Sequence, residues 1–333
     1  MQNHKMITVL LSLALTAAAV QAAKPTISYK TDGSNLIITY TGELYLSEDA
    51  VSWSKLDSAS NPYRVTMRNK KLFFCAKEIS DNKNFTIPLS DTVNLDMIWI
   101  EPGTFMMGSP EDELGRDPEK ETQHEVTLTK GYWMGKYEVT QSQYETLMGT
   151  NPSHSYGVGD EYPVYYVSWD DAMEFCAKLT TAEKAAGRLP EGYEYTLPTE
   201  AQWEYACRAE TTTALNNGKN LSDRNQCPEI DEVGWYGYNS DRTSHPAGEK
   251  KPNDWGLYDM HGNVQEWCLD WGDEYPTSPV VDPTGPDIGY SRVLRGGSRA
   301  NRAYACRSAF RSQFSPDYKA NEIGFRVALT LVK

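Results

Sequence analysis

The first part of the chain alternates between hydrophobic and polar positions in short runs. Alternation with a period of two places apolar side chains on one face, so these runs predict β-strands. Turn signals such as Asp32-Gly33 and Asn61-Pro62 separate them. The predicted strands cover residues 26–29, 36–41, 51–53, 63–67 and 72–75. They indicate a small all-β module, similar to a sandwich, over residues 24–93.

From Met97 onward the pattern changes. Apolar strands at 97–100 and 105–107 stand among long irregular stretches rich in Gly, Pro, Asn and aromatic residues. Residues 208–290 show little periodicity, and loops of this length in a compact domain are usually functional or are held by metals or disulfides. We therefore expect an α+β domain with little regular secondary structure over residues 95–333.

Three helices are nevertheless well marked within this second domain. Each begins with a capping box, in which a Ser or Thr is followed three residues later by a side chain that bonds back to the helix start. The three boxes are Thr140-x-x-Gln143, Ser168-x-x-Asp171 and Thr199-x-x-Gln202. The second helix should bury one face, made of Ala172, Phe175, Cys176 and Leu179.

The N-terminal residues 1–23 have the pattern of a signal peptide. Lys5 supplies the positive charge, 6–20 is an apolar run too short to span a bilayer comfortably, and Val20-Gln21-Ala22 has the small-residue spacing of a cleavage site. The alternative is a buried N-terminal helix. We expect an exported protein, periplasmic or extracellular, with no membrane span.

Composition narrows the classes of partner. The net charge of −14, without any Lys/Arg-rich stripe, argues against nucleic acid as a partner. The surplus of carboxylates suits solubility and bound Ca²⁺. The 21 Tyr and 9 Trp residues are common on ligand-contacting surfaces, although aromatic side chains also fill irregular cores.

Six cysteines stand at positions 75, 176, 207, 227, 268 and 306. In an exported chain they could form disulfides. The sequence contains no C-x-x-C or H-E-x-x-H motif, so we do not expect a structural zinc site.

Several blocks, in a fixed order, resemble the formylglycine-generating enzyme or sulfatase-modifying factor family. The clearest are Leu197-Pro198-Thr199-Glu200-Ala201-Gln202-Trp203 and Gly256-Leu257-Tyr258-Asp259-Met260-His261-Gly262-Asn263. The resemblance covers about residues 95–330 and implies a variant C-type-lectin-like fold with bound Ca²⁺. The remaining blocks are 97–109, 136–140, 163–169, 295–311 and 323–326.

Residues 259–266 have the makings of a Ca²⁺ site. Asp259 and Glu266 offer carboxylate oxygens, while Gly262 permits a tight turn that can bring its own carbonyl and that of Val264 to one point. The resemblance implies that these four positions hold structural Ca²⁺. The alternative is a hydrogen-bonded turn without metal.

The segment after Gly296-Gly297-Ser298 carries the frame of an oxidase active site. In family members that oxidise cysteine to formylglycine, two cysteines here bind Cu(I), which activates O₂. The first position is Asn301 in this chain, and the second is Cys306 only if the alignment has no gap. One thiolate and an amide make a poor Cu(I) site, so we do not expect copper. The candidate pocket residues are Ser298, Asn301, Cys306 and Arg311.

The resemblance also implies disulfides. It pairs Cys207 with Cys306, and it leaves Cys176 as a free buried thiol. Cys227 and Cys268 flank the expected Ca²⁺ loop and are a second predicted pair. If both pairs form, no thiol remains near Ser298.

Two functions follow from this frame. The first is a non-catalytic binding protein whose former substrate groove contacts a peptide, glycan or cell-surface protein through Arg299, Asn301, Arg302 and Tyr304. The second is a formylglycine-generating oxidase that acts on a sulfatase cysteine. A third possibility, an iron-dependent sulfur-oxidising relative, is disfavoured because the N-terminal module has no histidine after His4.

Overall fold

A computed structural model describes residues 27–32, 35–40, 43–47, 54–55, 63–66, 73–77 and 83–332. The chain divides into two compact units, Met1–Asn82 and Lys83–Lys333. The predicted signal peptide lies outside the described residues. No helix within these ranges combines the length and the apolar character needed to cross a membrane.

The described residues of the first unit form two three-stranded antiparallel sheets. In one, β2 (Asn35–Tyr40) lies between β1 (Ile27–Asp32) and β5 (Tyr63–Thr66); in the other, β3 (Glu43–Ser47) lies between β4 (Ser54–Lys55) and β6 (Phe73–Lys77). Four of the five predicted strands fall on β1, β2, β5 and β6. The fifth, at 51–53, lies outside the described residues, and β3 was not predicted.

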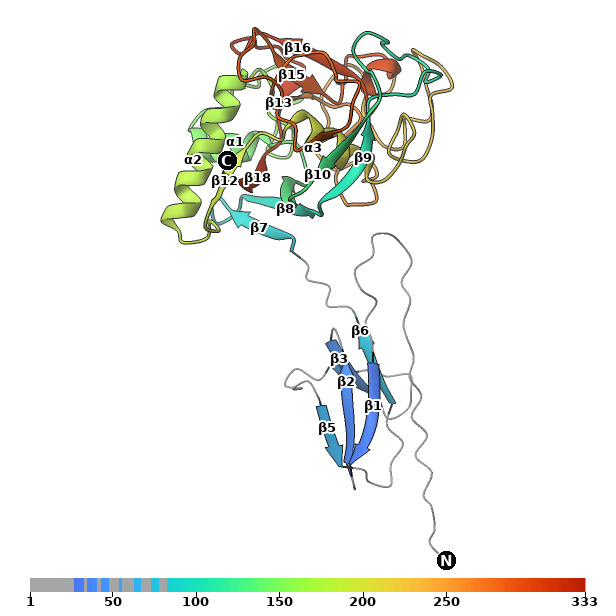
Figure 1. Ribbon diagram of the computed structural model, residues 1–333. Coiled ribbons are helices and arrows are strands. Elements are labelled where there is room, and N and C mark those ends of the chain that lie inside the picture. The colour runs from blue at the N-terminus through green and yellow to red at the C-terminus, as the bar shows by residue number, and fades with distance from the viewer. Residues whose placement is uncertain are drawn as a thin grey trace, which may run out of the picture. The chain divides into compact units, whose positions relative to one another are not determined.

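The main sheet of the second unit joins segments from both ends of that unit. Its antiparallel strand order is β12-β18-β11-β8-β7. Figure 1 labels β12, β18, β8 and β7 of this sheet. The position of β18 between β12 and β11 brings the C-terminal strand against both of them. The strands are β7 (Phe85–Pro88), β8 (Asn94–Ile100), β11 (Tyr132–Gly135), β12 (Tyr193–Thr196) and β18 (Ala328–Leu331).

The boundary between the units falls earlier than the predicted position at residue 93. Phe85 of β7 lies opposite Met97 of β8, so β7 belongs to the main sheet of the second unit. The second unit therefore begins at Lys83. The short length of β7 and the turn that follows it resemble the strands before it, which is why the pattern alone misplaced the boundary.

Two smaller sheets complete the second unit. One has the order β16-β15-β13-β17 and carries the segment that follows Arg295; the other has the order β14-β10-β9. Their strands are β9 (Gly103–Met107), β10 (His124–Leu128), β13 (Gln265–Trp271), β14 (Val280–Val281), β15 (Arg292–Arg295), β16 (Arg311–Phe314) and β17 (Ile323–Gly324). Residues 209–264 are fully described and contain neither helix nor strand, as the weak periodicity indicated.

All three predicted helices are present, and each begins at its predicted capping box. They are α1 (Gln141–Met148), α2 (Trp169–Ala185) and α3 (Glu200–Arg208), with a short 3₁₀ helix η1 (Ala303–Cys306) near the C-terminal end. At each start, the Ser or Thr side chain accepts from the third backbone N–H of the helix, and the third side chain bonds back.

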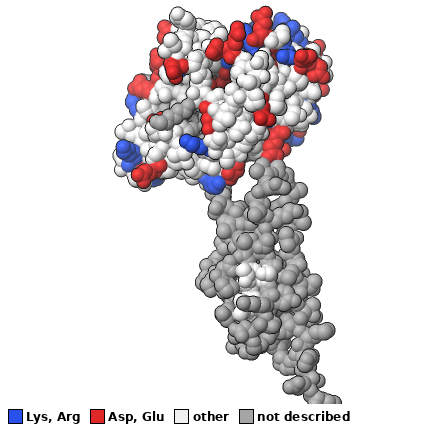
Figure 2. Space-filling view, in the orientation of Figure 1, with Lys and Arg blue, Asp and Glu red and all other residues white. Residues whose placement is uncertain are grey.

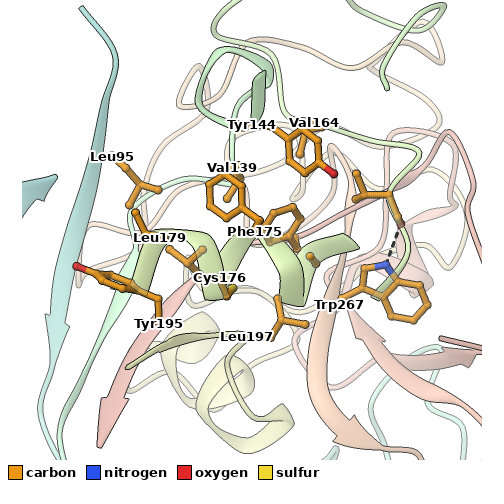
Figure 3. Packing of buried hydrophobic residues seen from close by; sticks show 14 of the residues in the cluster. Leu95, Val139, Tyr144, Val164, Phe175, Cys176, Leu179, Tyr195, Leu197 and Trp267 are labelled. Carbon is orange, nitrogen blue, oxygen red and sulfur yellow. Dashed lines mark hydrogen bonds between the residues drawn. The ribbon is translucent and has the colours of Figure 1, made fainter. Parts of the chain in front are cut away.

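The buried face of α2 anchors the larger hydrophobic core. Phe175 stacks on Tyr144 with ring centres 5.8 Å apart and meets Phe325 edge-on at 5.3 Å. Figure 3 shows Cys176, Leu179 and neighbouring side chains around this helix, with the Trp267 indole donating to the Val167 carbonyl at 3.0 Å. The four residues predicted for this face are all buried.

Buried ion pairs tie the irregular segments to this frame. Glu204 on α3 accepts from Arg295 at 2.5 Å, from Arg208 at 2.9 Å and from the Gly108 backbone N–H at 2.9 Å. Arg307 joins Glu113 and Glu121 of the 108–123 loop at 2.5 and 2.7 Å. These side chains are almost completely removed from solvent, so each charge depends on its partner.

Replacing Glu204 with Gln should lower the free energy of unfolding by about 3–5 kcal/mol, because two guanidinium groups lose a buried countercharge. The matched control is Glu174→Gln, which breaks the exposed i,i+4 pair with Lys178 on α2. That control should lose under about 0.5 kcal/mol. Urea denaturation followed by circular dichroism measures both. Equal losses would contradict the importance of the buried pair.

Candidate functional site

The Gly296-Gly297-Ser298 turn connects β15 to the segment that ends in η1. Both glycines have positive φ, of 87° and 68°. A Cβ on Gly297 would lie 2.4 Å from the Ala305 carbonyl oxygen and 2.7 Å from the Cys306 sulfur. Only glycine fits this position, and the turn therefore closes tightly against η1.

Ser298 and Asn301 bond to each other across this turn. The Ser298 hydroxyl donates to the Asn301 side-chain oxygen at 2.8 Å, and the Asn301 backbone N–H donates to the Ser298 carbonyl at 2.9 Å. The Gly237 N–H donates to the Asn301 carbonyl at 2.8 Å. Asn301 thus stabilises the turn, and its amide oxygen is already in use.

Cys306 lies beneath the turn as a free thiol. Its sulfur is 4.0 Å from the Ser298 carbonyl oxygen, and the side chain is fully buried in a small core cluster with Ala303 and Tyr236. Burial raises the pKa of the Cys306 thiol to about 12. The group is therefore protonated at neutral pH, and a protonated thiol is a poor metal ligand and nucleophile.

Neither predicted disulfide is formed in the structure. The side chain that faces Cys207 is Ser308, with sulfur and hydroxyl oxygen 3.6 Å apart, rather than Cys306. Cys227 and Cys268 lie in different hydrophobic clusters, and Cys227 donates to the Glu229 carboxylate at 2.9 Å.

The predicted pairing of Cys207 with Cys306 was wrong, because Ser308 stands against the Cys207 thiol and both cysteines are free. The prediction for Cys176 is confirmed, since it is a free buried thiol on α2.

Arg311 lies apart from the other three candidate pocket residues. Its guanidinium forms a two-pronged pair with Glu200, at 2.8 and 2.6 Å, and donates to the Asp273 carbonyl at 2.7 Å. It lines two cavities of about 340 and 610 Å³ beside the 272–286 loop. Ser298, Asn301 and Cys306 lie outside both cavities.

Arg299 projects into a tyrosine-lined position. Its guanidinium carbon lies 4.9 Å from the ring centre of Tyr156 and 5.7 Å from that of Tyr165. The Glu322 carboxylate is 3.9 Å from Nη1, beyond hydrogen-bond distance. Desolvation lowers the pKa of the Arg299 guanidinium. Sequence reasoning missed both tyrosines; the run of tyrosines around residues 156–166 was the available signal.

Arg302 and Tyr304 face a different neighbour. The exposed Arg302 donates to the Asn225 side-chain oxygen at 3.2 Å, and Arg224 lies over the Tyr304 ring at 4.7 Å. The four predicted ligand-binding residues are therefore close in sequence but divide in space. Arg299 contacts Tyr156 and Tyr165, and Asn301 stabilises the turn at Ser298. Arg302 and Tyr304 contact the loop at residues 224–225.

The predicted Ca²⁺ residues lie around one tight turn. Gly262 has φ 128°, and a Cβ there would lie 2.0 Å from the Trp235 carbonyl oxygen. Asp259 accepts from the Gly248 N–H at 2.7 Å with one carboxylate oxygen, while the other is buried without a partner. Both oxygens of Glu266 accept from Arg326 at 2.6 Å.

This turn holds an excess of negative charge. Glu138, Asp259 and Glu266 are all buried, and the guanidinium of Arg326 is a buried cation beside them. Burial raises the pKa of Asp259 to about 6; burial and the adjacent carboxylates raise that of Glu138 well above its usual value.

The described residues contain no group of three or more His, Cys, Asp or Glu arranged as metal ligands. A cation here would therefore need backbone carbonyls as well as the unpaired Asp259 oxygen. The charge excess and this orphan oxygen fit a hard cation such as Ca²⁺.

Surface charge agrees with an acidic protein. On the face shown in Figure 2, Lys and Arg stand among Asp and Glu without forming a continuous basic stripe. The exposed cations on this face are thus distributed among carboxylates. Buried arginines such as Arg295, Arg307 and Arg326 pair with glutamates inside the domain.

The tight Gly-Gly-Ser turn, the sparse secondary structure and the paired buried arginines define a loop-rich domain with a fixed frame. A family model described as the sulfatase-modifying factor enzyme 1-like domain matches residues 86–331. The chain therefore belongs to this family, as its motifs predicted.

Relatives extend over most of the chain. "Chaperone protein LppX" of Paenibacillus barcinonensis is 28% identical over 272 residues, covering 71% of this chain and 90% of that protein. The formylglycine-generating enzyme of Mus musculus is 28% identical over 295 residues, covering 70% and 74%. The solved structure of Treponema denticola variable protein 1 is 32% identical, with a TM-score of 0.63 and coverage of 74% and 98%.

Alkylation should distinguish free thiols from disulfides. In the folded protein at pH 8, iodoacetamide should label Cys207 and Cys306 slowly, because burial raises the pKa of each thiol to about 12. After unfolding without reductant, both should be labelled completely. Mass spectrometry of the peptides measures this, with a pre-reduced sample as the control. A disulfide-linked pair of peptides would contradict the structure.

Proposed function

We propose that this member of the sulfatase-modifying factor family is a non-catalytic binding protein. The observation that carries the proposal is the state of the turn after Ser298. Asn301 uses its amide oxygen on Ser298, and Cys306 is a buried, protonated thiol. Cu(I) chemistry needs accessible soft thiolate ligands, and this arrangement does not favour them.

The surroundings of the turn suit recognition. Arg299 with Tyr156 on one side, and Arg224 with Tyr304 on the other, combine guanidinium and aromatic groups common at binding surfaces. They lie on loops that are fixed to a rigid frame. Such loops are already ordered, so less conformational entropy is lost when a partner binds. A peptide, glycan or cell-surface protein is the proposed partner. A relative that carries the name of a chaperone supports a binding role.

Export supports the same role. The segment 1–23 has a signal-peptide pattern, and we infer that the mature protein acts in the periplasm or outside the cell.

The alternative function is a formylglycine-generating oxidase. The family match and relatives with this activity favour it, together with the position of Cys306 beside the Ser298 carbonyl. It would require Cys306 to become accessible and to act with a second soft ligand. The free state of Cys306 keeps this alternative testable.

A panel of peptides and glycans titrated against the wild type should identify a binder. The double variant Arg299→Ala/Arg302→Ala should weaken that binding at least tenfold, since charge-assisted contacts are lost. Lys184→Ala, at an exposed position of α2, removes a distant charge as the control. Calorimetry measures the affinities. Identical binding by all three proteins would contradict a role for this surface.

The same preparations test the oxidase alternative. A Cys-x-Pro-x-Arg peptide supplied with Cu(I) and O₂ should remain unchanged, and Cu(I) should not bind stoichiometrically under reducing conditions. Turnover lost in Cys306→Ser would establish the oxidase and refute the non-catalytic proposal.

We also propose structural Ca²⁺ at the 259–266 turn. Asp259 would hold it with the carbonyls of Gly262 and Val264 and with Glu266, and the ion would offset the buried negative charge.

Removing divalent ions with EGTA should lower the melting temperature, and Ca²⁺ should restore it. Asp259→Ala should abolish the response, whereas Asp254→Ala, an exposed neighbour, should keep it. Equal responses in both variants would contradict the site.

A further inference from the structure

All but one of the buried arginines in the described part of the second unit donate hydrogen bonds to a carboxylate. Arg299 is as deeply buried but makes no such bond within the described residues. The five paired residues are Arg208, Arg295, Arg307, Arg311 and Arg326.

The unmet hydrogen-bonding capacity of Arg299 is specific. Its Nε and Nη1 atoms are buried without partners. A buried donor without an acceptor costs the free energy of its lost hydration, and a charged donor costs more than a neutral one. The Asn321 side-chain oxygen, one residue before Glu322, and the Ser244 hydroxyl, on the segment bonded to the Tyr156 carbonyl, are also buried without partners. Further unsatisfied polar atoms thus lie on the segments that bear or bond to Tyr156 and Glu322, two neighbours of this guanidinium.

The groups around Arg299 differ in their freedom to move. The Tyr165 ring is buried, and its hydroxyl accepts from the Ser155 and Tyr156 N–H groups at 2.9 and 2.7 Å. The Tyr156 side chain is 41% exposed and the Glu322 side chain is 39% exposed. Tyr165 therefore forms a fixed wall, whereas Tyr156 and Glu322 can turn toward solvent without disturbing the core.

We propose that Arg299 is the receptor for a carboxylate group of the ligand, with Tyr156 as a movable cover and Glu322 as an internal competitor. This inference rests on the proposed binding function. The carboxylate would accept from the guanidinium, as glutamates do at each of the other five buried arginines. Glu322, held 3.9 Å away, occupies the approach without completing the bond.

A carboxylate is favoured over a dianionic phosphate by local charge. Glu322 and the net charge of −14 both oppose a second negative charge at this position. A single carboxylate can accept from two guanidinium nitrogens at once, as Glu266 does from Arg326. The ligand class is therefore a molecule with a free carboxylate, such as an acidic side chain or the C-terminus of a peptide.

Sodium acetate is the probe that tests this site alone. At constant ionic strength, with chloride as the reference anion, saturating acetate should raise the melting temperature of the wild type by about 2–4 °C. Glu322→Gln should reach half of its shift at an acetate concentration at least fivefold lower, because the competing charge is absent. Arg299→Gln should show no acetate shift, and Lys184→Gln should respond as the wild type does.

These measurements test the carboxylate site separately from the proposed binding function. An unchanged acetate response in Arg299→Gln would overturn the site. If that variant does not fold, equal acetate responses of Glu322→Gln and the wild type would overturn it instead.

A peptide from the panel gives the second comparison. Equal affinity for its free-acid form and for a form with every carboxylate amidated would leave the binding function standing and refute the carboxylate site. An acetate shift that depends on Arg299, without any binder in the panel, would support the site and count against the proposed macromolecular partner.

Discussion

Paired buried charges hold the second unit together. Glu204 contacts the 108 segment, α3 and β15 through Gly108, Arg208 and Arg295, so a single carboxylate fixes three distant parts of the chain. In a domain where residues 209–264 form no helix or strand, few backbone ladders can do this. Ion pairs in a low-dielectric interior are specific, since any shift that separates the partners leaves a charge without compensation. The irregular loops are thereby held in one arrangement.

That frame explains how one fold can carry either catalysis or recognition. The Gly-Gly-Ser turn packs closely against η1. The backbone geometry of the turn does not depend on which side chains follow it. The identity of those side chains determines the chemistry of the site. Here Asn301 bonds to the Ser298 hydroxyl and Cys306 is a buried thiol, while Arg299 keeps an unsatisfied guanidinium among tyrosines. The family assignment rests on the frame, and the proposed function rests on these few positions.

The predictable features were local. Capping boxes at Thr140, Ser168 and Thr199 place all three helices, because the signal lies within four residues. Motifs identified the family for the same reason. The disulfide between Cys207 and Cys306 and the location of Arg311 were wrong, since both depend on which distant segments meet. Ser308, two residues beyond Cys306, lies opposite Cys207. The tyrosines around Arg299 were missed because no local pattern links residues 156 and 299.

The place of β18 in the main sheet has a consequence for how the chain acquires its structure. This strand, Ala328–Leu331, lies between β11 and β12, although β11 is made almost two hundred residues earlier and β12 well over one hundred residues earlier. Until it emerges from the ribosome, β12 and β11 have no common neighbour, and the sheet remains open between them. Closure of the main sheet during synthesis therefore waits until Ala328–Leu331 has been made.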